Sequence, residues 1–505
     1  MASNLFTAFA ASSHRDKVFL APPGRPPISF ADAFEQSARF AHVLKAHGVK
    51  PGDRVAVQVE KSAEALILYL ASLRTGAVFL PLNTGYTASE LSYFIIDSSP
   101  RVFVCSPKDA DMIADLCDGS EILTLGADGR SGSLIAEAKG QSTSFADADV
   151  GMGDLAAILY TSGTTGRSKG AMLSHGNLLS NAQALKDVWQ FTERDVLLHA
   201  LPIFHTHGLF VATNVSLLAG ATIILLPKFD VEEIFRLLPQ ATCMMGVPTF
   251  YVRLLQDARL HREAARHMRL FISGSAPLLA ETHREWSERT GHDVLERYGM
   301  TETNMITSNP YVGRRVPGSV GFPLPGTDLR IADDAGAPLP QGEIGMIEVR
   351  GPNVFSGYWC MPEKTRAEFR SDGFFITGDL GKIDSEGYVH IVGRGKDLVI
   401  TGGFNVYPKE VETLIDGLPG VEESAVIGLP HDDFGEGVTA IVIAKKGSTL
   451  TEAQIMSALD GRLAKFKLPK RVLFADQFPR NTMGKIQKNL LREQFRNLYK
   501  QSGKA

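Results

Sequence analysis

Cysteine is scarce in this sequence, long apolar runs are missing, and neither sign of charge dominates. Scattered cysteines are typical of reduced thiols in a cytoplasm and do not suggest a disulfide framework or a metal site. No apolar segment reaches membrane-spanning length, and the N-terminus lacks the basic region of a secretory signal. A net charge of −4 argues against nucleic acid or an anionic membrane as the main partner. We therefore expect a cytoplasmic protein that acts on small molecules. The four cysteines are Cys105, Cys117, Cys243 and Cys360.

The length of 505 residues predicts at least two domains. Helical and strand patterns alternate between residues 30 and 150 and again between 196 and 275, with a predicted helix at Phe30–Ala46 and predicted strands at Arg54–Val59 and Leu270–Ser273. Such repeated units predict parallel sheets covered by helices. After about residue 317, glycine and proline become frequent, and short strands such as Ile344–Arg350 indicate an antiparallel β-subdomain.

One segment combines a predicted strand with a loop suited to phosphate. The apolar run Leu155–Leu159 is followed by glycines, hydroxyl residues and two cations between Tyr160 and Gly170. Glycine lets backbone N–H groups converge on one point, and hydroxyls and cations add to the attraction for phosphate oxygens. The segment is not a P-loop, because Lys169 is followed by glycine where that motif requires Ser or Thr. The alternative interpretation is a polar hairpin turn.

This segment resembles the phosphate loop of the adenylate-forming superfamily, which includes acyl-CoA synthetases, luciferases and the adenylation domains of peptide synthetases. The resemblance extends over nearly the whole chain. It implies an α/β fold whose large N-terminal domain, residues 1–395, contains two parallel-type α/β subdomains and a distorted β-barrel. A small mobile α+β domain, residues 396–505, would follow and turn about Lys396. ATP, Mg²⁺ and coenzyme A are the implied cofactor and substrates.

Further motifs match the superfamily's nucleotide site. In Glu296–Glu302, the resemblance places Tyr298 on the adenine, Thr301 at the α-phosphate and Glu302 on Mg²⁺. A hard cation held by a carboxylate would offset the repulsion between ATP and a second anion. Asp379 and Arg394 match the pair that binds the ribose hydroxyls. Each of these short motifs, taken alone, is also compatible with an ordinary turn or helix start.

The C-terminal motifs are assigned to catalysis and to CoA. Lys485, at the end of Pro479–Lys485, resembles the catalytic lysine whose ammonium binds the reacting carboxylate and the α-phosphate. The same lysine is a candidate for acetylation by a lysine acetyltransferase, which would remove its charge. The loop Thr401–Pro408 resembles the segment presented to the pantetheine arm of CoA, and a plain hairpin turn is the alternative.

Arg297 indicates which acid is activated, because many acyl-CoA synthetases have glycine at the matching position. A guanidinium there would block a long acyl tunnel and bind a second carboxylate, with Arg253 as a second cation. Together with Ala200–His207, this residue makes the chain resemble the malonate-activating members of the superfamily. The implied reaction joins malonate to CoA through malonyl-AMP, with methylmalonate as a secondary substrate. Alternatively, Arg297 or Arg253 forms an ion pair with Glu296 or Asp257, and His207 serves in packing and does not contact the substrate.

Two rival functions remain open at this stage. A synthetase for another small acid would have a neutral residue in place of Arg297, and a non-catalytic nucleotide-binding protein would lack Lys485 or Glu302. The residues assigned to ATP are Thr161, Ser162, Gly163, Thr164, Thr165, Gly166, Lys169, Gly274, Ser275, Ala276, Pro277, Glu296, Arg297, Tyr298, Gly299, Met300, Asp379, Arg394 and Lys485. The residues assigned to malonate are Arg253, Arg297, His207, Ser275 and Met300; to CoA, Gly402, Gly403 and Phe404; to the metal, Glu302 and Thr164; and to catalysis, Lys485, Glu302 and Thr301.

Overall fold

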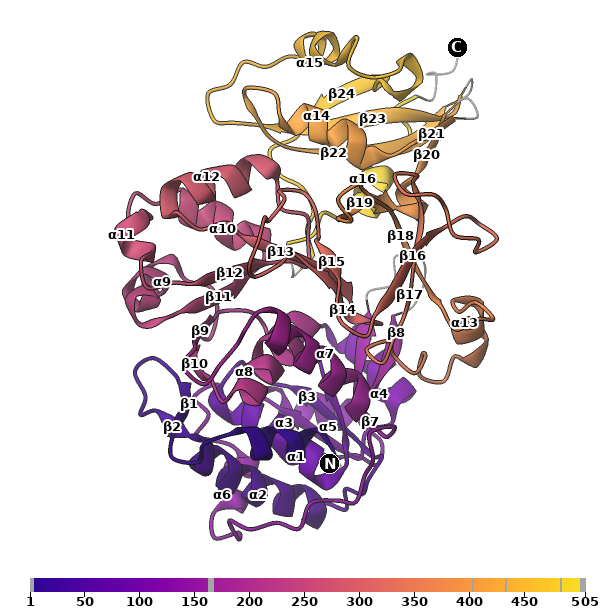
Figure 1. Ribbon diagram of the computed structural model, residues 1–505. Coiled ribbons are helices and arrows are strands. Elements are labelled where there is room, and N and C mark those ends of the chain that lie inside the picture. The colour runs from indigo at the N-terminus through magenta and orange to yellow at the C-terminus, as the bar shows by residue number, and fades with distance from the viewer. Residues whose placement is uncertain (1–3, 162–167, 402–403, 432–433, 482–483, 500–505) are drawn as a thin grey trace.

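Four sheets make up the protein, which is known from a computed structural model (Figure 1). The structure describes residues 4–161, 168–401, 404–431, 434–481 and 484–499. Two large sheets lie one above the other, an antiparallel sheet flanks them, and a C-terminal domain lies at the top of Figure 1. Within the described ranges, none of the helices combines the length and apolar character needed to cross a membrane.

The first sheet has six strands. The first five in the order below run parallel to one another, as the alternating strand and helix patterns predict. Their order is β6 (Glu121–Thr124), β5 (Val102–Cys105), β3 (Arg54–Gln58), β4 (Val78–Pro81), β7 (Leu155–Thr161) and β8 (Lys169–Ser174). β8 returns antiparallel to β7, so the two strands carry the ends of the predicted phosphate loop. Helices α4 (Ala88–Ser98) and α5 (Ala110–Leu116) cover one face of this sheet.

The second sheet has nine strands with a parallel centre. Their order is β15 (Phe322–Pro323), β14 (Asn304–Ser308), β13 (Leu295–Met300), β12 (Leu270–Ser273), β11 (Cys243–Gly246), β9 (Val196–His199), β10 (Thr222–Leu225), β1 (Val18–Ala21) and β2 (Ile28–Ser29). Its outer face packs on α9 (Val231–Leu237), α10 (Pro248–Leu255) and α12 (Ala280–Thr290), with α11 (Arg262–Ala265) beside α12.

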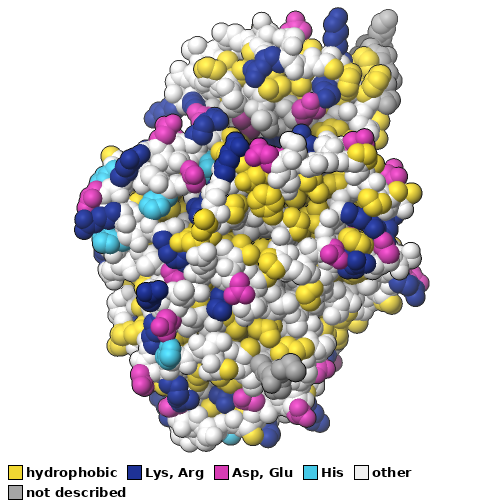
Figure 2. Space-filling model, viewed as in Figure 1, with side chains coloured by type: hydrophobic (Ala, Val, Ile, Leu, Met, Phe, Trp, Pro, Cys, Tyr) yellow, Lys and Arg dark blue, Asp and Glu magenta, His cyan; other side chains and the backbone are white. Residues whose placement is uncertain are grey.

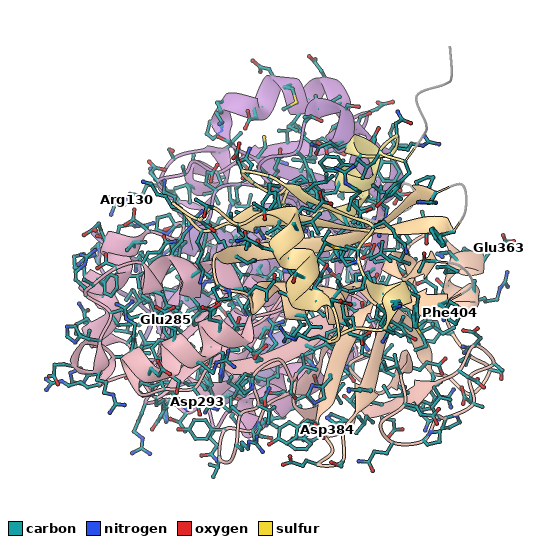
Figure 3. The ribbon with its side chains drawn as sticks, turned by 90° about the horizontal axis from the view of Figure 1, so that it is seen from above. Arg130, Glu285, Asp293, Glu363, Asp384 and Phe404 are labelled. Atoms are coloured by element: carbon teal, nitrogen blue, oxygen red, sulfur yellow. The ribbon has the colours of Figure 1, made fainter. Side chains whose placement is uncertain are left out.

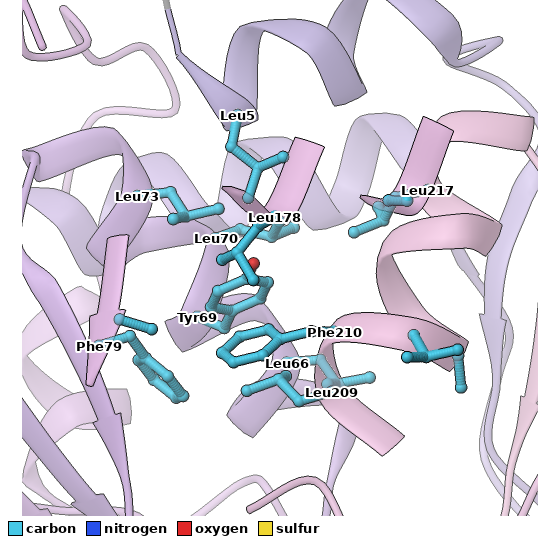
Figure 4. Close-up of a cluster of buried hydrophobic side chains, with 14 of the residues drawn as sticks. Leu5, Leu66, Tyr69, Leu70, Leu73, Phe79, Leu178, Leu209, Phe210 and Leu217 are labelled. Carbon is cyan, nitrogen blue, oxygen red and sulfur yellow. The ribbon is translucent and has the colours of Figure 1, made fainter. Parts of the chain in front are cut away.

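A shared helical core joins the inner faces of the two large sheets (Figure 4). All residues of α3 (Ala63–Thr75) are buried, and it begins at the Ser62 cap. Its Tyr69 meets Phe79 edge-on at 5.3 Å and donates to Asn214 at 3.2 Å. Tyr69 also meets Phe210 at 6.0 Å, and this aromatic contact, together with the bond to Asn214, joins α3 to the helices of the second sheet. The other helices of this region are α1 (Leu5–Ser12), α2 (Phe30–Ala46), α6 (Ser133–Ala138), α7 (His175–Val188) and α8 (Asn214–Ala219).

The region after residue 317 forms the expected antiparallel β-unit. Its four strands follow in the order β16 (Asp328–Ala332), β17 (Gly345–Arg350), β18 (Phe375–Ile383) and β19 (Val389–Arg394), with α13 (Pro362–Ala367) alongside. The hairpin register places Asp379 of β18 directly opposite Arg394 of β19. The fold therefore brings the two predicted ribose ligands together.

The C-terminal domain has its own core. Its sheet contains β21 (Phe404–Val406), β20 (Val399–Thr401), β23 (Gly435–Ala444), β22 (Val421–His431) and β24 (Arg471–Phe474). Helices α14 (Pro408–Asp416) and α15 (Glu452–Leu459) pack on one apolar cluster, and α16 (Lys488–Gln494) packs on the other. Both clusters are built from residues after 398, which is typical of an independent folding unit.

A buried ion pair ties together the amino-terminal ends of three strands in the second sheet. Arg269 donates to Asp195 from Nε at 2.6 Å and from Nη2 at 2.8 Å, and the Thr242 hydroxyl donates to the same carboxylate at 2.8 Å. Asp195 is only 3% exposed. Burial alone would raise the pKa of Asp195, but Arg269 and these hydrogen bonds hold it below its ordinary value. The stability that the ionised Asp195 carboxylate contributes is therefore lost as the pH falls through its lowered pKa.

We expect Asp195→Ala to lower the free energy of unfolding of this unit by about 3 kcal/mol, because the Arg269 charge would be left largely buried and unpaired. Urea titration followed by tryptophan fluorescence checks this, since Trp189 and Trp286 are both fully buried. The control is Glu233→Ala, whose exposed pair with Arg236 should matter little. If both substitutions lower the free energy of unfolding by the same amount, the stabilising role of the buried Asp195–Arg269 pair is contradicted.

Candidate active site

A hydrogen-bonded trio forms the predicted nucleotide site. Tyr298, on β13, donates its hydroxyl to Asp379 Oδ2 at 2.5 Å, and Arg394 Nε lies 2.8 Å from Asp379 Oδ1. Asp379 is 4% exposed, and its charge raises the pKa of Arg394, which keeps the guanidinium charged. The second sheet and the β-unit thus meet at one carboxylate. Seen from above, the C-terminal domain lies over the place where they meet (Figure 3).

Glu302 lies in a second cluster, just after β13. Its carboxylate is 5% exposed and accepts a hydrogen bond from Tyr358 Oη at 3.0 Å. The same hydroxyl lies 2.5 Å from Glu368, which also accepts from Lys169 Nζ at 3.1 Å. Burial raises the pKa of Glu302, and Tyr358 and the charge of Lys169 oppose this only in part. The cluster therefore holds a carboxylate that an additional cation would stabilise.

The donor set near Glu302 fits Mg²⁺ bound together with phosphates. Within the described ranges, no three His, Cys, Asp or Glu side chains converge as a metal cage. Magnesium usually takes one or two carboxylates and completes its shell with water and substrate phosphates. Glu302 is then the described residue that would hold the ion. Thr164, the other predicted ligand, lies outside the described residues.

The structure places the two ends of the predicted phosphate loop beside this cluster. Thr161 ends β7, and Lys169 begins β8 with its ammonium 4.1 Å from the centre of the Tyr358 ring. Lys169 is thus held by an aromatic face and by Glu368. The remaining predicted loop residues lie outside the described ranges: Ser162, Gly163, Thr164, Thr165 and Gly166.

Lys485 extends from the C-terminal domain toward the nucleotide site. A methyl group of Thr249, at the start of α10, lies 3.3 Å from where a Gly484 side chain would begin, so this loop touches the large domain. The Lys485 side chain keeps access to solvent. Surrounding protein atoms, and then the charge of Arg394, lower the pKa of its ammonium. The predicted catalytic lysine therefore lies within electrostatic range of the two predicted ribose ligands.

Arg297 is a buried cation without a hydrogen-bonded partner on two of its nitrogens. It is 3% exposed, and its Nε and Nη2 atoms have no partner among the described residues. The guanidinium lies against Gly274, where a built Cβ would meet its Nη1 at 2.5 Å. A side chain at this position would displace the guanidinium from where it lies. Burial lowers the pKa of Arg297 to about 9, so it stays charged at neutral pH.

The surroundings of Arg297 contain further buried groups without partners. His207 is fully buried; its Nδ1 is 3.3 Å from the Ser275 hydroxyl, and its Nε2 has no partner in the described chain. Burial, and then the charge of Arg297, lower the pKa of His207 well below its usual range, so the ring is neutral. Ser275 is held at φ 71°. Orphaned donors around a buried cation are what an anionic ligand would satisfy.

The ion pairs considered as alternatives for the two arginines are not formed. Glu296 accepts from the Gly318 amide at 3.0 Å, and Asp257 pairs with Arg259. Arg253 is exposed on α10, with its guanidinium 6.0 Å from the Phe229 ring centre. No described contact joins Arg253 to Arg297, so its predicted part in acid binding stays a prediction.

The other predicted residues line the same region or the domain junction. Thr301 and Met300 are half-buried at the end of β13, and Ala276 and Pro277 follow Ser275 after β12. Gly299 touches the Asn304 carbonyl so closely that no side chain would fit. Lys396 lies in a short turn between β19 and β20. Phe404 is 55% exposed, stacks on Phe466 and is labelled in the view from above (Figure 3). The space-filling view shows hydrophobic side chains gathered on the face just below the C-terminal domain (Figure 2). Gly402 and Gly403 lie outside the described residues.

Three residues near the site were not singled out from the sequence. Tyr358 and Glu368 organise Glu302 and Lys169, yet neither belongs to a motif with a stated chemistry. Burial, and then the charges of Arg297 and Lys485, lower the pKa of His205 to about 4. Its place in the stretch Ala200–His207, next to His207, was the available signal.

Comparisons with known proteins agree with these features. A family model described as AMP-binding enzyme matches residues 7–359, and a model of the AMP-binding enzyme C-terminal domain matches residues 410–485. The chain is 37% identical to a feruloyl-CoA synthase of Amycolatopsis sp over 477 residues, which cover 94% of this chain and 95% of that protein. It is 34% identical to a malonate–CoA ligase of Arabidopsis thaliana over 484 residues, 89% and 79% of the two chains.

Solved structures give the same result for the fold. The ATP-bound form of MatB from Rhodopseudomonas palustris is 62% identical, with a TM-score of 0.97 and coverage of 99% of this chain and 100% of that chain. The apo form of MatB, at the same 62% identity, has a TM-score of 0.87. The superfamily and the α/β architecture expected from the motifs are confirmed. This chain belongs to the family of AMP-binding enzymes.

Proposed function

We propose that the protein is an ATP-dependent ligase that joins malonate to CoA through malonyl-AMP and releases AMP and pyrophosphate. The observation that carries this proposal is the charged Arg297 guanidinium, which is buried beside His207 and Ser275 with two nitrogens that have no partner among the described residues. Similarity to a malonate–CoA ligase and to MatB supports the same substrate class. ATP and CoA are the co-substrates, with Mg²⁺ as the cofactor.

The pocket around Arg297 favours a small acid with two carboxylates. One carboxylate reacts with ATP, and the other can accept two hydrogen bonds from the guanidinium in a bidentate pair. A fatty acid would leave the buried charge without a partner, at a cost of several kcal/mol. Methylmalonate fits as a secondary substrate, because one added methyl group changes binding by only about 1–3 kcal/mol.

An aromatic acid is the second candidate substrate, since the feruloyl-CoA synthase is the more identical of the two curated relatives described above. A neutral ring next to Arg297 would bury the guanidinium without satisfying Nε and Nη2. This cost favours the dicarboxylate. A non-catalytic nucleotide-binding role is disfavoured because Lys485 and Glu302 are both present near the trio that would hold the nucleotide.

In the first half-reaction, a malonate oxygen bonds to the α-phosphorus, and the bond from that phosphorus to the bridging oxygen of pyrophosphate breaks. Asp379 and Arg394 would hold the ribose hydroxyls while Tyr298 packs against the adenine. The Lys485 ammonium would lie where negative charge gathers between the carboxylate and the α-phosphate. Mg²⁺ on Glu302 would supply charge that offsets the phosphate oxygens. Lys169 would exchange Glu368 for a phosphate oxygen.

We place the hinge between residues 1–395 and 396–505 at Lys396. The turn Gly395–Asp397 separates β19 from β20, and apolar clusters of the small domain begin only at Val399. The higher TM-score against ATP-bound than against apo MatB is consistent with an arrangement suited to adenylation. In the second half-reaction, rotation would withdraw Lys485 and present Phe404 and its loop to the pantetheine arm.

Two further proposals concern the acetylation of Lys485 and the location of the protein in the cell. Solvent access of the Lys485 side chain is compatible with acetylation by a lysine acetyltransferase, which would remove the charge that adenylation needs. Intact-mass measurement after exposure to such an enzyme tests this. A cytoplasmic location is proposed because the four cysteines are free, as expected for a reducing compartment.

Lys485→Ala should slow malonyl-AMP formation by on the order of 10²–10³-fold, because a donor that stabilises developing charge is removed. The exchange of pyrophosphate into ATP in the presence of malonate measures this step. Lys446→Ala, an exposed lysine in the same domain, is the control and should leave the rate unchanged. Normal exchange by the Lys485 variant would show that the assignment is wrong.

A panel of acids tests the substrate class. Pyrophosphate release should be fastest with malonate, slower with methylmalonate, and weak with acetate, succinate and octanoate. Octanoate or ferulate above malonate would overturn the proposal.

Arg297→Met should reduce kcat/KM for malonate by on the order of 10²-fold, because the second carboxylate loses its charged partner. The loss should be much smaller for acetate, which has no second carboxylate. The same panel with Arg253→Met tests the exposed arginine, and a loss confined to malonate would place that guanidinium on the acid. Unchanged acid preference in Arg297→Met would assign selectivity to other residues.

A further inference from the structure

A lysine of the first sheet unit reaches into the second at a point next to the acid pocket. Lys61 lies between β3 and α3, and its ammonium is 3.0 Å from His199 Nδ1 and 2.9 Å from the His199 carbonyl oxygen. His199 ends β9 and is fully buried. The contact therefore connects the two large sheets at the carboxyl end of a central strand.

The hydrogen bonds of His199 determine which ring nitrogen carries the proton. Its Nε2 lies 2.8 Å from the Gly208 carbonyl oxygen, which can only accept, so Nε2 must carry a hydrogen. Burial, and then the charge of Lys61, lower the pKa of His199 well below its usual range, so the ring is neutral. Nδ1 is consequently a bare acceptor, and Lys61 must be the donor. The chain of contacts runs from Lys61 through the ring to Gly208.

Gly208 lies where the loop of residues 200–206, called here the acid-pocket loop, turns into a helix. Its carbonyl also accepts from the Thr213 hydroxyl at 3.0 Å, and its α-carbon lies so close to the Pro202 carbonyl that a side chain would not fit. The π-helix His207–Thr213 starts here. His207 then faces Ser275. A shift of Gly208 would therefore move the histidine beside Arg297.

On its other side, this loop borders a small cavity whose lining combines apolar side chains with the charged Lys61 and Glu60. The cavity is lined by Lys61 together with Val57, Phe79, Pro202, Ile203 and Phe204. Apolar contacts are non-directional, and an unfilled space beside Ile203 and Phe204 gives the loop room to relax. The directional contact that holds the loop across this gap is the Lys61–His199 pair.

We propose that Lys61 is a positioning residue for acid selection: through His199 and Gly208 it holds His207 in register with Ser275 and Arg297. This inference rests on the proposed malonate site. Lys61 would touch neither ATP nor the acid. Its loss should therefore change how the acid binds without changing how the nucleotide binds.

The test compares Lys61→Met with Lys17→Met in the full-length enzyme. Methionine keeps most of the length of lysine and removes its donors. Lys17 also ends on a backbone carbonyl, that of Gly220 at 2.7 Å, but at the amino-terminal end of β10, away from the acid pocket. Lys61→Met should raise KM for malonate on the order of tenfold or more, as expected when a reacting group is misplaced. KM for ATP should stay within about twofold of the unmodified enzyme, because Asp379 and Arg394 are untouched.

These KM values separate positioning from stability, because a smaller folded fraction lowers kcat and leaves KM unchanged. Lys17→Met should leave both KM values unchanged. If Lys61→Met is insoluble, Lys61→Gln retains one donor group and should give an intermediate KM for malonate. Equal KM values in the Lys61 and Lys17 variants would overturn the inference. If the unmodified enzyme does not prefer malonate, the proposed function fails instead, and the acid panel identifies that outcome.

Discussion

The active site depends on a positive charge that is buried and left incompletely paired. Water is excluded from Arg297, and two of its nitrogens lack acceptors in the part of the chain that the structure describes, which is a cost that an anionic ligand can relieve. Gly274 makes room for the guanidinium, and neutral His207 and Ser275 surround it without neutralising it. In the proposed function, selectivity would follow from what the guanidinium rejects as much as from what it binds, because an uncharged acyl tail cannot replace the missing acceptors.

Most other charges near the site already have partners within the protein. Asp379 is paired with Arg394, Lys169 with Glu368, and Glu302 accepts from Tyr358. These contacts hold the side chains in place before ATP binds, which reduces the reorganisation needed during the reaction. Lys169 and Glu302 would change partners when phosphate and metal arrive, whereas the Tyr298–Asp379–Arg394 trio already presents its polar groups together. The proposed nucleotide site would therefore be largely preformed, and the proposed acid site around Arg297 would be the part that lacks its counter-ion.

Two domains share this chemistry, and their connection explains how one site can serve two steps. Lys485 belongs to the small domain, whose core is separate from that of the large domain, and it reaches the site by way of a loop that touches Thr249. A residue delivered by a separately folded unit can be withdrawn by rotation without unfolding either core. Residues such as Arg297 and Asp379 belong to the large domain and would remain for both half-reactions.

The sequence alone was sufficient for the local elements and for the motif residues. Helix Phe30–Ala46 and strand Leu270–Ser273 were predicted with the bounds that the structure has, because periodicity and capping are local properties. Asp379, Arg394, Glu302 and Lys485 were predicted as site residues because they stand in spaced motifs, and the fold brings Asp379 and Arg394 together. Only the tertiary structure showed that two nitrogens of Arg297 have no partner among the described residues and that Arg253 is exposed. It also showed that Tyr358 and Lys61 contact residues far away in the chain. Burial and pairing depend on which strands become neighbours, and that information is spread over hundreds of residues and does not appear in any short pattern.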